Sequence, residues 1–262
     1  MAMSAAARAT PAESTQVAAE APYTSRDSAS PEGGEAAPSA KASGTSAAPT
    51  NAEVPAKPIM KSIDCRKVRC IALTFDDGPG PYTGQVVSAL QAKGAKATFF
   101  MLGSQVGGRE ATVRSVKDAG MEIGNHSFNH PDLRGLKSAG IRSQFQRADA
   151  ALAKAGARAT LYRPPYGALN STVRSVLSDR PILLWGVDTL DWKTQSSAST
   201  LRSASRAPRG AIILMHDIHR STANAIPGIV SALQARGYHL VTVSELLRAP
   251  RPGKVYTGPY AR

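Results

Sequence analysis

Cysteine, aromatic residues and long apolar runs are all scarce in this chain of 262 residues. Two cysteines exclude a disulfide-dense scaffold and a zinc module built on four thiolates. The longest apolar stretches, at 181–187 and 211–215, are far shorter than the ~20 residues of a membrane-spanning helix, so no membrane span is expected. Aromatic residues make up only 5% of the chain, and no glycine-rich phosphate loop is present.

Acidic residues are the minority, since 19 Asp and Glu face 32 Lys and Arg for a net charge of +13. The excess belongs to residues 58–262, which hold 28 basic and 13 acidic side chains, a net +15. This charge suits an anionic partner, and a nucleic-acid-binding protein is one alternative. The basic residues are scattered and are not interleaved with aromatic residues. We therefore expect no nucleic-acid partner.

Residues 1–57 differ sharply in composition from the rest. They hold 18 alanines and no Leu, Ile, Phe, Trp or Cys, so they cannot bury enough apolar surface to offset chain entropy. The start, M-A-M-S-A-A-A-R, lacks the apolar core of a secretory signal, and no signal peptide is visible. We expect a disordered spacer over 1–57, a folded domain over 58–250 and a short basic tail over 251–262.

Strand-like and helix-like segments alternate through the folded part. We expect strands or extended segments at 68–75, 97–102, 121–124, 161–163, 181–187, 211–215 and 239–243. Helices are expected at 82–93, 111–119, 141–155, 171–179, 199–207 and 225–236. A repeated β-then-α order favours a parallel sheet with helices outside it. The repeats predict an α/β fold that is a small, incomplete barrel, with an open doubly wound sheet as the alternative.

Chemically active residue types follow several of these strands, where α/β folds collect functional groups. T-F-D-D closes the first strand with Asp76 and Asp77, and N-H-S-F-N-H follows the third with His126 and His130. Two imidazoles and a carboxylate that leave one position open describe a catalytic zinc site. A capped turn before Gly-Pro and two surface histidines are the plain structural alternatives.

Three more segments share this placement. R-P-P-Y-G contains Arg163 and Tyr166, D-T-L-D-W contains Asp191 and Trp192, and L-M-H-D contains His216. Each also has a structural interpretation: a rigid proline loop with a surface arginine, a tryptophan that fills a core gap, or a histidine that is merely hydrogen-bonded. The individual segments leave both interpretations open.

In their order along the chain, the five segments resemble the motifs of the polysaccharide deacetylase family. Those motifs are T-F-D-D, H-[ST]-x-x-H, R-x-P-Y, D-x-x-D-W and L-x-H, and all are matched here. The family comprises metal-dependent carbohydrate esterases, among them chitin, chitooligosaccharide and peptidoglycan deacetylases and acetylxylan esterases. The resemblance implies a distorted (β/α) barrel with fewer than eight complete repeats.

The resemblance also implies a role for each matched residue. The metal ligands would be Asp77, His126 and His130, and the ion would be Zn²⁺, with Co²⁺ as a substitute. Asp76 would be the general base and Arg163 would orient it.

The remaining roles concern the leaving group and the substrate pocket. His216 would be the general acid, with Asp191 bonded to its ring. The backbone N–H of Tyr166 would help to hold the oxyanion, and Trp192 and Leu214 would line the acetyl pocket.

The implied activity is hydrolytic deacetylation of N-acetylglucosamine residues in a polysaccharide, peptidoglycan or chitin-type oligomers, with release of acetate. An O-acetyl esterase acting on acetylxylan is the alternative. A catalytically silent wall-binding module should have lost a ligand or the base, and none is missing. We expect a monomer that acts outside the cell or at the cell wall.

Cys65 and Cys70 flank R-K-V-R just before the first strand. As a reduced pair they could be metal ligands, but the metal site is already supplied by other segments. We expect a small disulfide-closed loop, which implies an oxidising compartment.

Overall fold

The main strands of the sheet lie where the buried segments predict them. The computed structural model describes residues 63–258, so the spacer expected over 1–57 lies outside the described residues. A parallel sheet has the order β3-β2-β1-β6-β5, and β7 pairs with the first half of β1. Its strands are β1 (Arg69–Asp76), β2 (Ala97–Met101), β3 (Glu122–Asn125), β5 (Val187–Asp188), β6 (Ile212–His216) and β7 (Tyr238–Leu240).

The expected strand at 181–187 is split in two, and its halves pair with different strands. β4 (Ile182–Leu183) pairs with β8 (Val255–Tyr256), whereas β5 pairs with β6. Between them the backbone changes partners, because Leu184 N–H donates to Tyr256 and Gly186 N–H donates to Ile212. Tyr162 bridges the ends of β3 and β4. The predicted incomplete (β/α) barrel is confirmed, and part of the expected 251–262 tail contributes strand β8.

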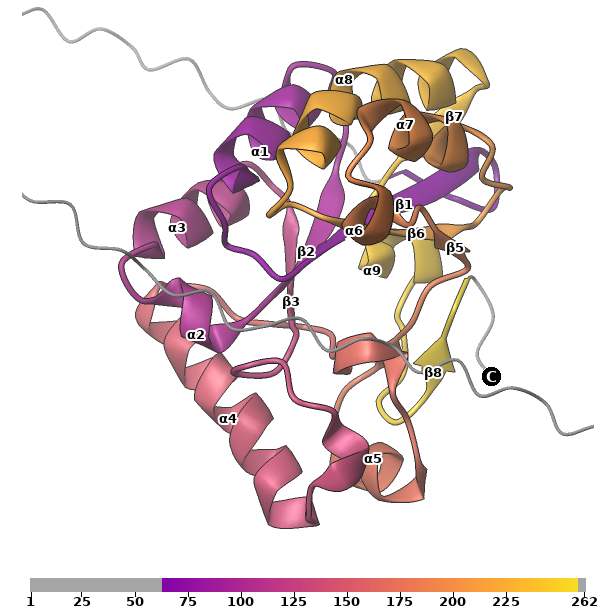
Figure 1. Ribbon diagram of the computed structural model, residues 1–262. Helices are drawn as coiled ribbons and strands as arrows, with labels where there is room; N and C mark the ends of the chain where they lie inside the picture. Colours follow the sequence, from indigo (N-terminus) through magenta and orange to yellow (C-terminus); the bar gives the residue numbers. More distant parts are fainter. Residues whose placement is uncertain (1–62, 259–262) are drawn as a thin grey trace, which may run out of the picture. The chain divides into compact units, whose positions relative to one another are not determined.

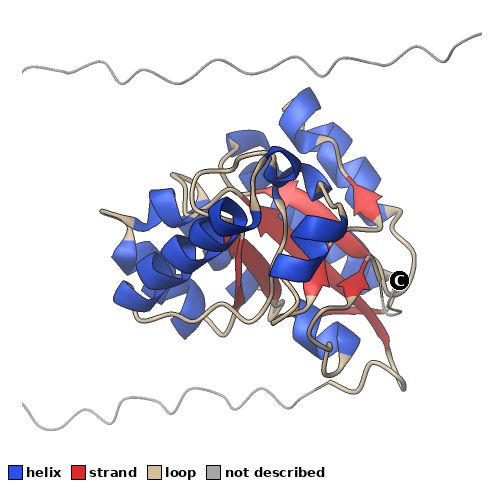
Figure 2. Ribbon diagram, turned by 90° about the horizontal axis from the view of Figure 1, so that it is seen from below, coloured by secondary structure: helices blue, strands red, loops and turns tan. Residues whose placement is uncertain are grey.

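Helices cover the outside of the sheet (Figures 1 and 2). The long ones are α1 (Thr83–Gln91), α3 (Glu110–Asp118), α4 (Ser138–Lys154), α7 (Ser197–Ser205) and α8 (Arg220–Ala235), and α8 begins five residues before its predicted start. The short ones are α2 (Gly103–Val106), α5 (Ser171–Val176), α6 (Asp191–Thr194) and α9 (Val243–Leu247), with 3₁₀ turns η1 (Leu133–Gly135) and η2 (Pro165–Gly167). Among the described residues, no helix combines the length and apolarity that crossing a membrane requires.

Alternation along β1 separates the core from the site. Ile71, Leu73 and Phe75 join the cluster of apolar side chains beneath the helices. Successive residues of a strand point to opposite faces, so Thr74 and Asp76 point into the barrel. Both are nevertheless buried, at 0% and 2% exposure. A buried carboxylate is costly unless it is paired, which directs attention to its partners at the end of the strand.

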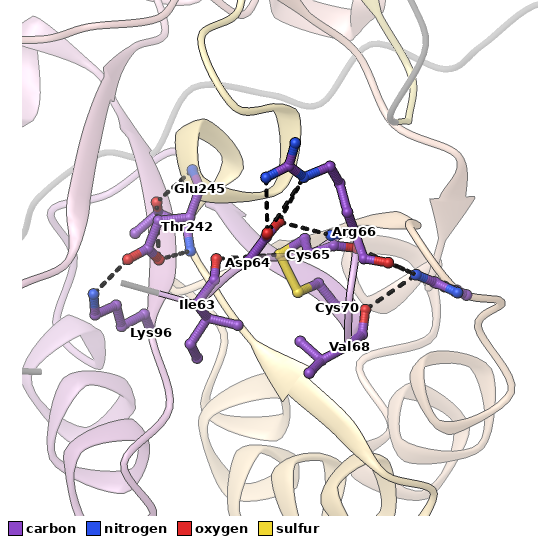
Figure 3. The surroundings of a disulfide bond; sticks show 10 residues. Ile63, Asp64, Cys65, Arg66, Val68, Cys70, Lys96, Thr242 and Glu245 are labelled. Carbon is purple, nitrogen blue, oxygen red and sulfur yellow. Dashed lines mark hydrogen bonds and ion pairs between the residues drawn. A yellow bond between two sulfur atoms is a disulfide. The ribbon is translucent and has the colours of Figure 1, made fainter. Parts of the chain in front are cut away.

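A disulfide bond between Cys65 and Cys70 closes the loop that leads into β1 (Figure 3). Asp64 and Arg66 form an exposed ion pair beside it. The Arg209 guanidinium donates to three carbonyl oxygens of the loop, those of Cys65, Arg66 and Val68, at 3.1–3.3 Å. The start of β1 is thereby fixed both by the disulfide bond and by the hydrogen bonds of the Arg209 side chain.

We expect no free thiol when the oxidised protein is unfolded without reductant and titrated. The double variant Cys65→Ala/Cys70→Ala should lose about 2 kcal/mol of unfolding free energy, because so short a loop removes little chain entropy from the unfolded state. Urea unfolding of the two proteins measures this difference. Two titratable thiols in the wild-type protein would contradict the expectation and remove the argument for an oxidising compartment.

Candidate active site

The carboxyl ends of β1, β3 and β6 bring the predicted site residues to one end of the barrel. Asp76 ends β1 and lies in register with His216, the last residue of the neighbouring strand β6. Asn125 ends β3, so the histidine segment begins at the same edge. Tyr162 bridges β3 and β4, which brings Arg163 to this edge as well. The parallel arrangement is therefore what collects side chains from distant parts of the sequence.

Asp77, His126 and His130 form a compact set of candidate metal ligands, with one ligand atom from each lying within 4.8 Å of the others. His126 Nε2 lies 3.6 Å from Asp77 Oδ1, and His130 Nε2 lies 3.5 Å from the same oxygen. Ligand atoms about 2.1 Å from a tetrahedral zinc ion are separated by roughly 3.4 Å. The two distances from the carboxylate to the imidazoles therefore fit a divalent ion of this kind.

The hydrogen bonds around the three side chains fit metal binding too. His126 Nδ1 lies 2.8 Å from the carbonyl oxygen of Arg163, and a proton donated there leaves Nε2 with a free lone pair. Burial, followed by the nearby His126, lowers the pKa of His130 to about 4, so its imidazole is neutral at neutral pH. Asp77 Oδ1 is buried and has no hydrogen-bond partner among residues 63–258, as expected of an oxygen that ligates an ion.

Three of the predicted site residues have a left-handed backbone conformation. The φ angles are 72° at Asp77, 59° at His130 and 59° at Tyr166, a region that non-glycine residues avoid. Such strain is retained where surrounding contacts enforce it, and it gathers at functional sites. The backbone conformation at these three residues is therefore one that their residue types do not favour.

Arg163 is the partner of the buried Asp76 carboxylate. Its side chain is fully buried, and Nη1 donates to Asp76 Oδ1 at 2.7 Å and to Thr74 Oγ1 at 2.8 Å. Nη2 donates to the Leu184 carbonyl at 3.1 Å, and the guanidinium stacks on the Phe100 ring at 4.0 Å. The charge of Asp76 is thus compensated and the carboxylate is held in one orientation.

His216 and Asp191 form a second buried pair. His216 Nδ1 lies 2.9 Å from Asp191 Oδ1, and the His216 backbone N–H donates to Oδ2 at 2.7 Å. Thr222 Oγ1 and the Trp192 backbone N–H also donate to this carboxylate. Burial alone would lower the pKa of His216, but the hydrogen bond and charge of Asp191, with Asp76 and Asp77, raise it to about 9. The imidazole is therefore protonated at neutral pH.

The remaining predicted residues are Tyr166 in the turn η2, Trp192 in helix α6 and Leu214 in strand β6. The Tyr166 ring contacts the His130 ring, with centroids 4.5 Å apart, and is 65% exposed. Trp192 is 43% exposed, whereas Leu214 is buried in β6. The acetyl pocket that these two side chains would line stays a prediction.

Several polar residues that the sequence analysis did not single out support the site. Thr74 accepts from Arg163 and is the first letter of T-F-D-D, so the motif itself held a signal. Asn125 directly precedes His126, and Thr222 lies in the first turn of α8; neither had a signal of its own. Asp217 is buried against Gly78, where an added Cβ would lie 2.5 Å from its Oδ2. That approach requires glycine in the turn after Asp77.

Replacing Asp191 by Asn should lower the pKa of His216, which histidine NMR titration of the metal-free protein can follow. The folded-state pKa of about 9 lies above the ordinary value of 6.5. The contribution of the His216–Asp191 pair to the free energy of unfolding is therefore complete below about pH 6.5 and is lost as the pH rises through 9. The variant should lack this pH dependence, worth up to about 3 kcal/mol. Asp188→Asn is the matched control, since that carboxylate accepts from Leu190 N–H instead. Equal titration of His216 in both variants would contradict the account.

The fold and the site define a parallel (β/α) barrel protein with a candidate metal centre at its strand ends. The chain belongs to the polysaccharide deacetylase family, whose model matches residues 64–183. That match ends before Asp191 and His216, which the barrel brings to the same site.

Named relatives and a solved structure agree with this assignment. The chain is 40% identical over 197 residues to the peptidoglycan-N-acetylmuramic acid deacetylase PdaC of Bacillus subtilis, covering 74% of this chain and 42% of the relative. It is 37% identical over 201 residues to the peptidoglycan-N-acetylglucosamine deacetylase PgdA of Listeria monocytogenes, covering 76% and 42%. The chain thus spans about two fifths of these relatives' length. A structure of T48 deacetylase with substrate is 42% identical with a TM-score of 0.72, covering 74% of this chain and 99% of that one.

Proposed function

We propose that this protein hydrolyses the N-acetyl group of N-acetylglucosamine residues in a polysaccharide, peptidoglycan or chitin-type oligomers, and releases acetate. The observation that supports this best is the pairing at one barrel end of an Asp/His/His ligand set with two further groups suited to proton transfer, Asp76 and His216. The names of PdaC and PgdA support a cell-wall N-acetyl substrate.

Asp77, His126 and His130 would hold a divalent ion, Zn²⁺ by preference and Co²⁺ as a substitute. When bound, such an ion acts as a Lewis acid that acidifies water and polarises a carbonyl oxygen. One carboxylate and two neutral imidazoles neutralise only one of its two positive charges. The site would therefore keep the positive charge that an oxyanion needs.

Asp76 is the proposed general base. Its Oδ1 is occupied by Arg163, while Oδ2 lies 3.5 Å from His126 Nε2, on the side of the ligand set. A carboxylate fixed in this way can accept a proton from water that attacks the acetyl carbonyl. Arg163 would act as its positioning partner.

His216 is the proposed general acid. An amide nitrogen leaves only when it is protonated, and an imidazolium with a raised pKa is protonated at neutral pH. Asp191 would orient the ring and stabilise its charge. The backbone N–H of Tyr166 would help to hold the oxyanion, and Trp192 and Leu214 would line the acetyl pocket.

The same constellation would also hydrolyse an O-acetyl ester, so an acetylxylan esterase is the alternative to separate by experiment. The peptidoglycan deacetylase names of the relatives favour the amide. The Cys65–Cys70 disulfide supports action outside the cytoplasm, at or beyond the cell wall. We propose that the catalytic domain follows the spacer, begins near residue 58, extends past the expected boundary at 250 to include strand β8, and acts as a monomer.

The test is acetate release from chitooligosaccharides, peptidoglycan and acetylxylan, measured in parallel with defined metals. The Asp76→Asn protein, prepared in the same way, controls for contaminating esterases. We expect release from at least one N-acetylated polymer to exceed that from acetylxylan. Release from acetylxylan alone would replace the proposal by the esterase, and release from none would refute both.

A further inference from the structure

Asn125, directly before the candidate ligand His126, is fully buried and uses both ends of its side-chain amide. Its Oδ1 accepts from the Ser127 backbone N–H at 2.8 Å. Its Nδ2 donates to the Phe145 carbonyl at 2.9 Å and to Asp149 Oδ1 at 2.8 Å. One end of the amide faces a donor and the other faces two acceptors, so only one orientation satisfies all three bonds.

The turn that this amide holds is unfavourable by itself. Ser127 has a φ angle of 73° and His130 one of 59°, both in the left-handed region. The bond from Ser127 N–H to Asn125 closes an Asx turn with His126 at its centre. Ser127 Oγ then accepts from the His130 backbone N–H at 3.1 Å. The positions of both imidazoles therefore depend on how the Asn125 amide is oriented.

Asp149 fixes that orientation from helix α4, and Arg180 fixes Asp149. Arg180 donates to the two carboxylate oxygens at 2.9 and 2.7 Å, a two-point ion pair that holds the plane of the carboxylate. The arginine is itself anchored, since it donates to the Ala159 carbonyl and stacks on the Tyr162 ring at 4.6 Å. A continuous chain of polar contacts thus runs from Arg180 through Asp149 and Asn125 to the candidate metal site.

We propose that Asp149 is a positioning residue of the metal site, which acts through Asn125 and is held in place by Arg180. Asp149 lies outside all five motifs and contacts none of the candidate ligands directly. The inference rests on the metal centre of the proposed function and adds a determinant of its affinity. Loss of outer-shell partners typically weakens metal binding about 10–100-fold, and a residue one step further out should fall near the lower end.

The experiment compares Co²⁺ dissociation constants of the metal-free wild type, Asp149→Ala, Asp149→Asn and Asp179→Ala, with thermal melting measured for each. Asp179 is the matched control: it lies 3.9 Å from Arg180 Nε and accepts from Tyr162 Oη, but it does not touch Asn125. We expect Asp149→Ala to bind Co²⁺ about tenfold more weakly and Asp179→Ala to bind as the wild type does. Asp149→Asn keeps an oxygen acceptor but loses the ion pair, so its affinity should lie between them.

A merely structural role would lower the melting temperature without changing the Co²⁺ affinity of the folded protein. If Asp149→Ala binds Co²⁺ as tightly as Asp179→Ala does, the inference is therefore overturned and the proposed function is unaffected. Should Asp149→Ala not fold, Asp149→Asn decides, and an affinity equal to that of Asp179→Ala overturns the inference in the same way. A wild-type protein that binds no Co²⁺ overturns the metal centre of the proposed function, and the inference with it.

Discussion

Exhaustive treatment with a chelator is expected to reduce acetate release to background, and Zn²⁺ or Co²⁺ should restore it. The expectation rests on the spacing of Asp77, His126 and His130, whose ligand atoms lie within 4.8 Å of one another. Without the ion the barrel end lacks a group that can acidify water to a pKa of roughly 7, so no second pathway of similar rate is available. Because the ligands must be deprotonated, occupancy should also fall at acid pH.

His126→Ala tests the same site through the chain itself. The variant should lose both stoichiometric metal and activity, and added Zn²⁺ should not restore it to the wild-type rate. His239→Ala is a suitable control, because His239 is an exposed histidine on β7, a strand that pairs with the first residues of β1 rather than with its end. Activity that survives chelation, with metal content well below one ion per chain, would refute the assignment of the three ligands.

The main elements and their order could be predicted because burial patterns are local. Val86, Val87 and Leu90 recur at helical spacing and all belong to the apolar cluster beneath the helices. The site could be located for a related reason. In a parallel fold, polar residues that directly follow buried strands all lie at the carboxyl edge of the sheet. Asp76 and His216 illustrate this, since they are 140 positions apart in sequence and in register in space.

What could not be predicted depends on contacts between distant segments. The split of the strand at 181–187 follows from the change of backbone partner from Tyr256 to Ile212, and no local pattern encodes it. The left-handed turns at Asp77 and His130 lack the glycine that usually marks such a conformation. The hydrogen bond from Thr222 to Asp191 likewise joins residues of two separate helices. These features appear only once the barrel is assembled.

Asp76→Asn should lower the rate on every substrate by roughly 10²–10⁴-fold, the usual range for loss of a general base. Metal should stay bound, because Asp77, His126 and His130 are unchanged and the Asn amide keeps the shape of the carboxylate. Arg163 would then face a neutral group, so a modest loss of unfolding free energy should accompany the change. Metal content and melting temperature, measured with the rates, separate the loss of the base from loss of the site.

The loss of rate in His216→Ala should depend on the leaving group of the substrate. An amide nitrogen needs a proton in order to leave, so N-acetyl substrates should lose roughly 10²–10⁴-fold in rate. An activated aryl oxygen leaves as its anion and needs no such proton, so the loss on an aryl acetate should be far smaller. Asp76→Asn should show no such dependence, because both substrates require water to be deprotonated. The pattern across two variants and two substrates, with metal content checked in each, is therefore more informative than any single rate.

An equal loss on both substrates in His216→Ala, with metal intact, would exclude His216 as the acid for the leaving group. The position of His216 suggests what it would do instead. It lies in register with Asp76 across β1 and β6, close enough for the charges of Asp76 and Asp77 to raise its pKa. A cation there could stabilise the oxyanion, which forms on amides and esters alike. Asp76 would then have to transfer the proton in both steps, first from water and then to the leaving nitrogen.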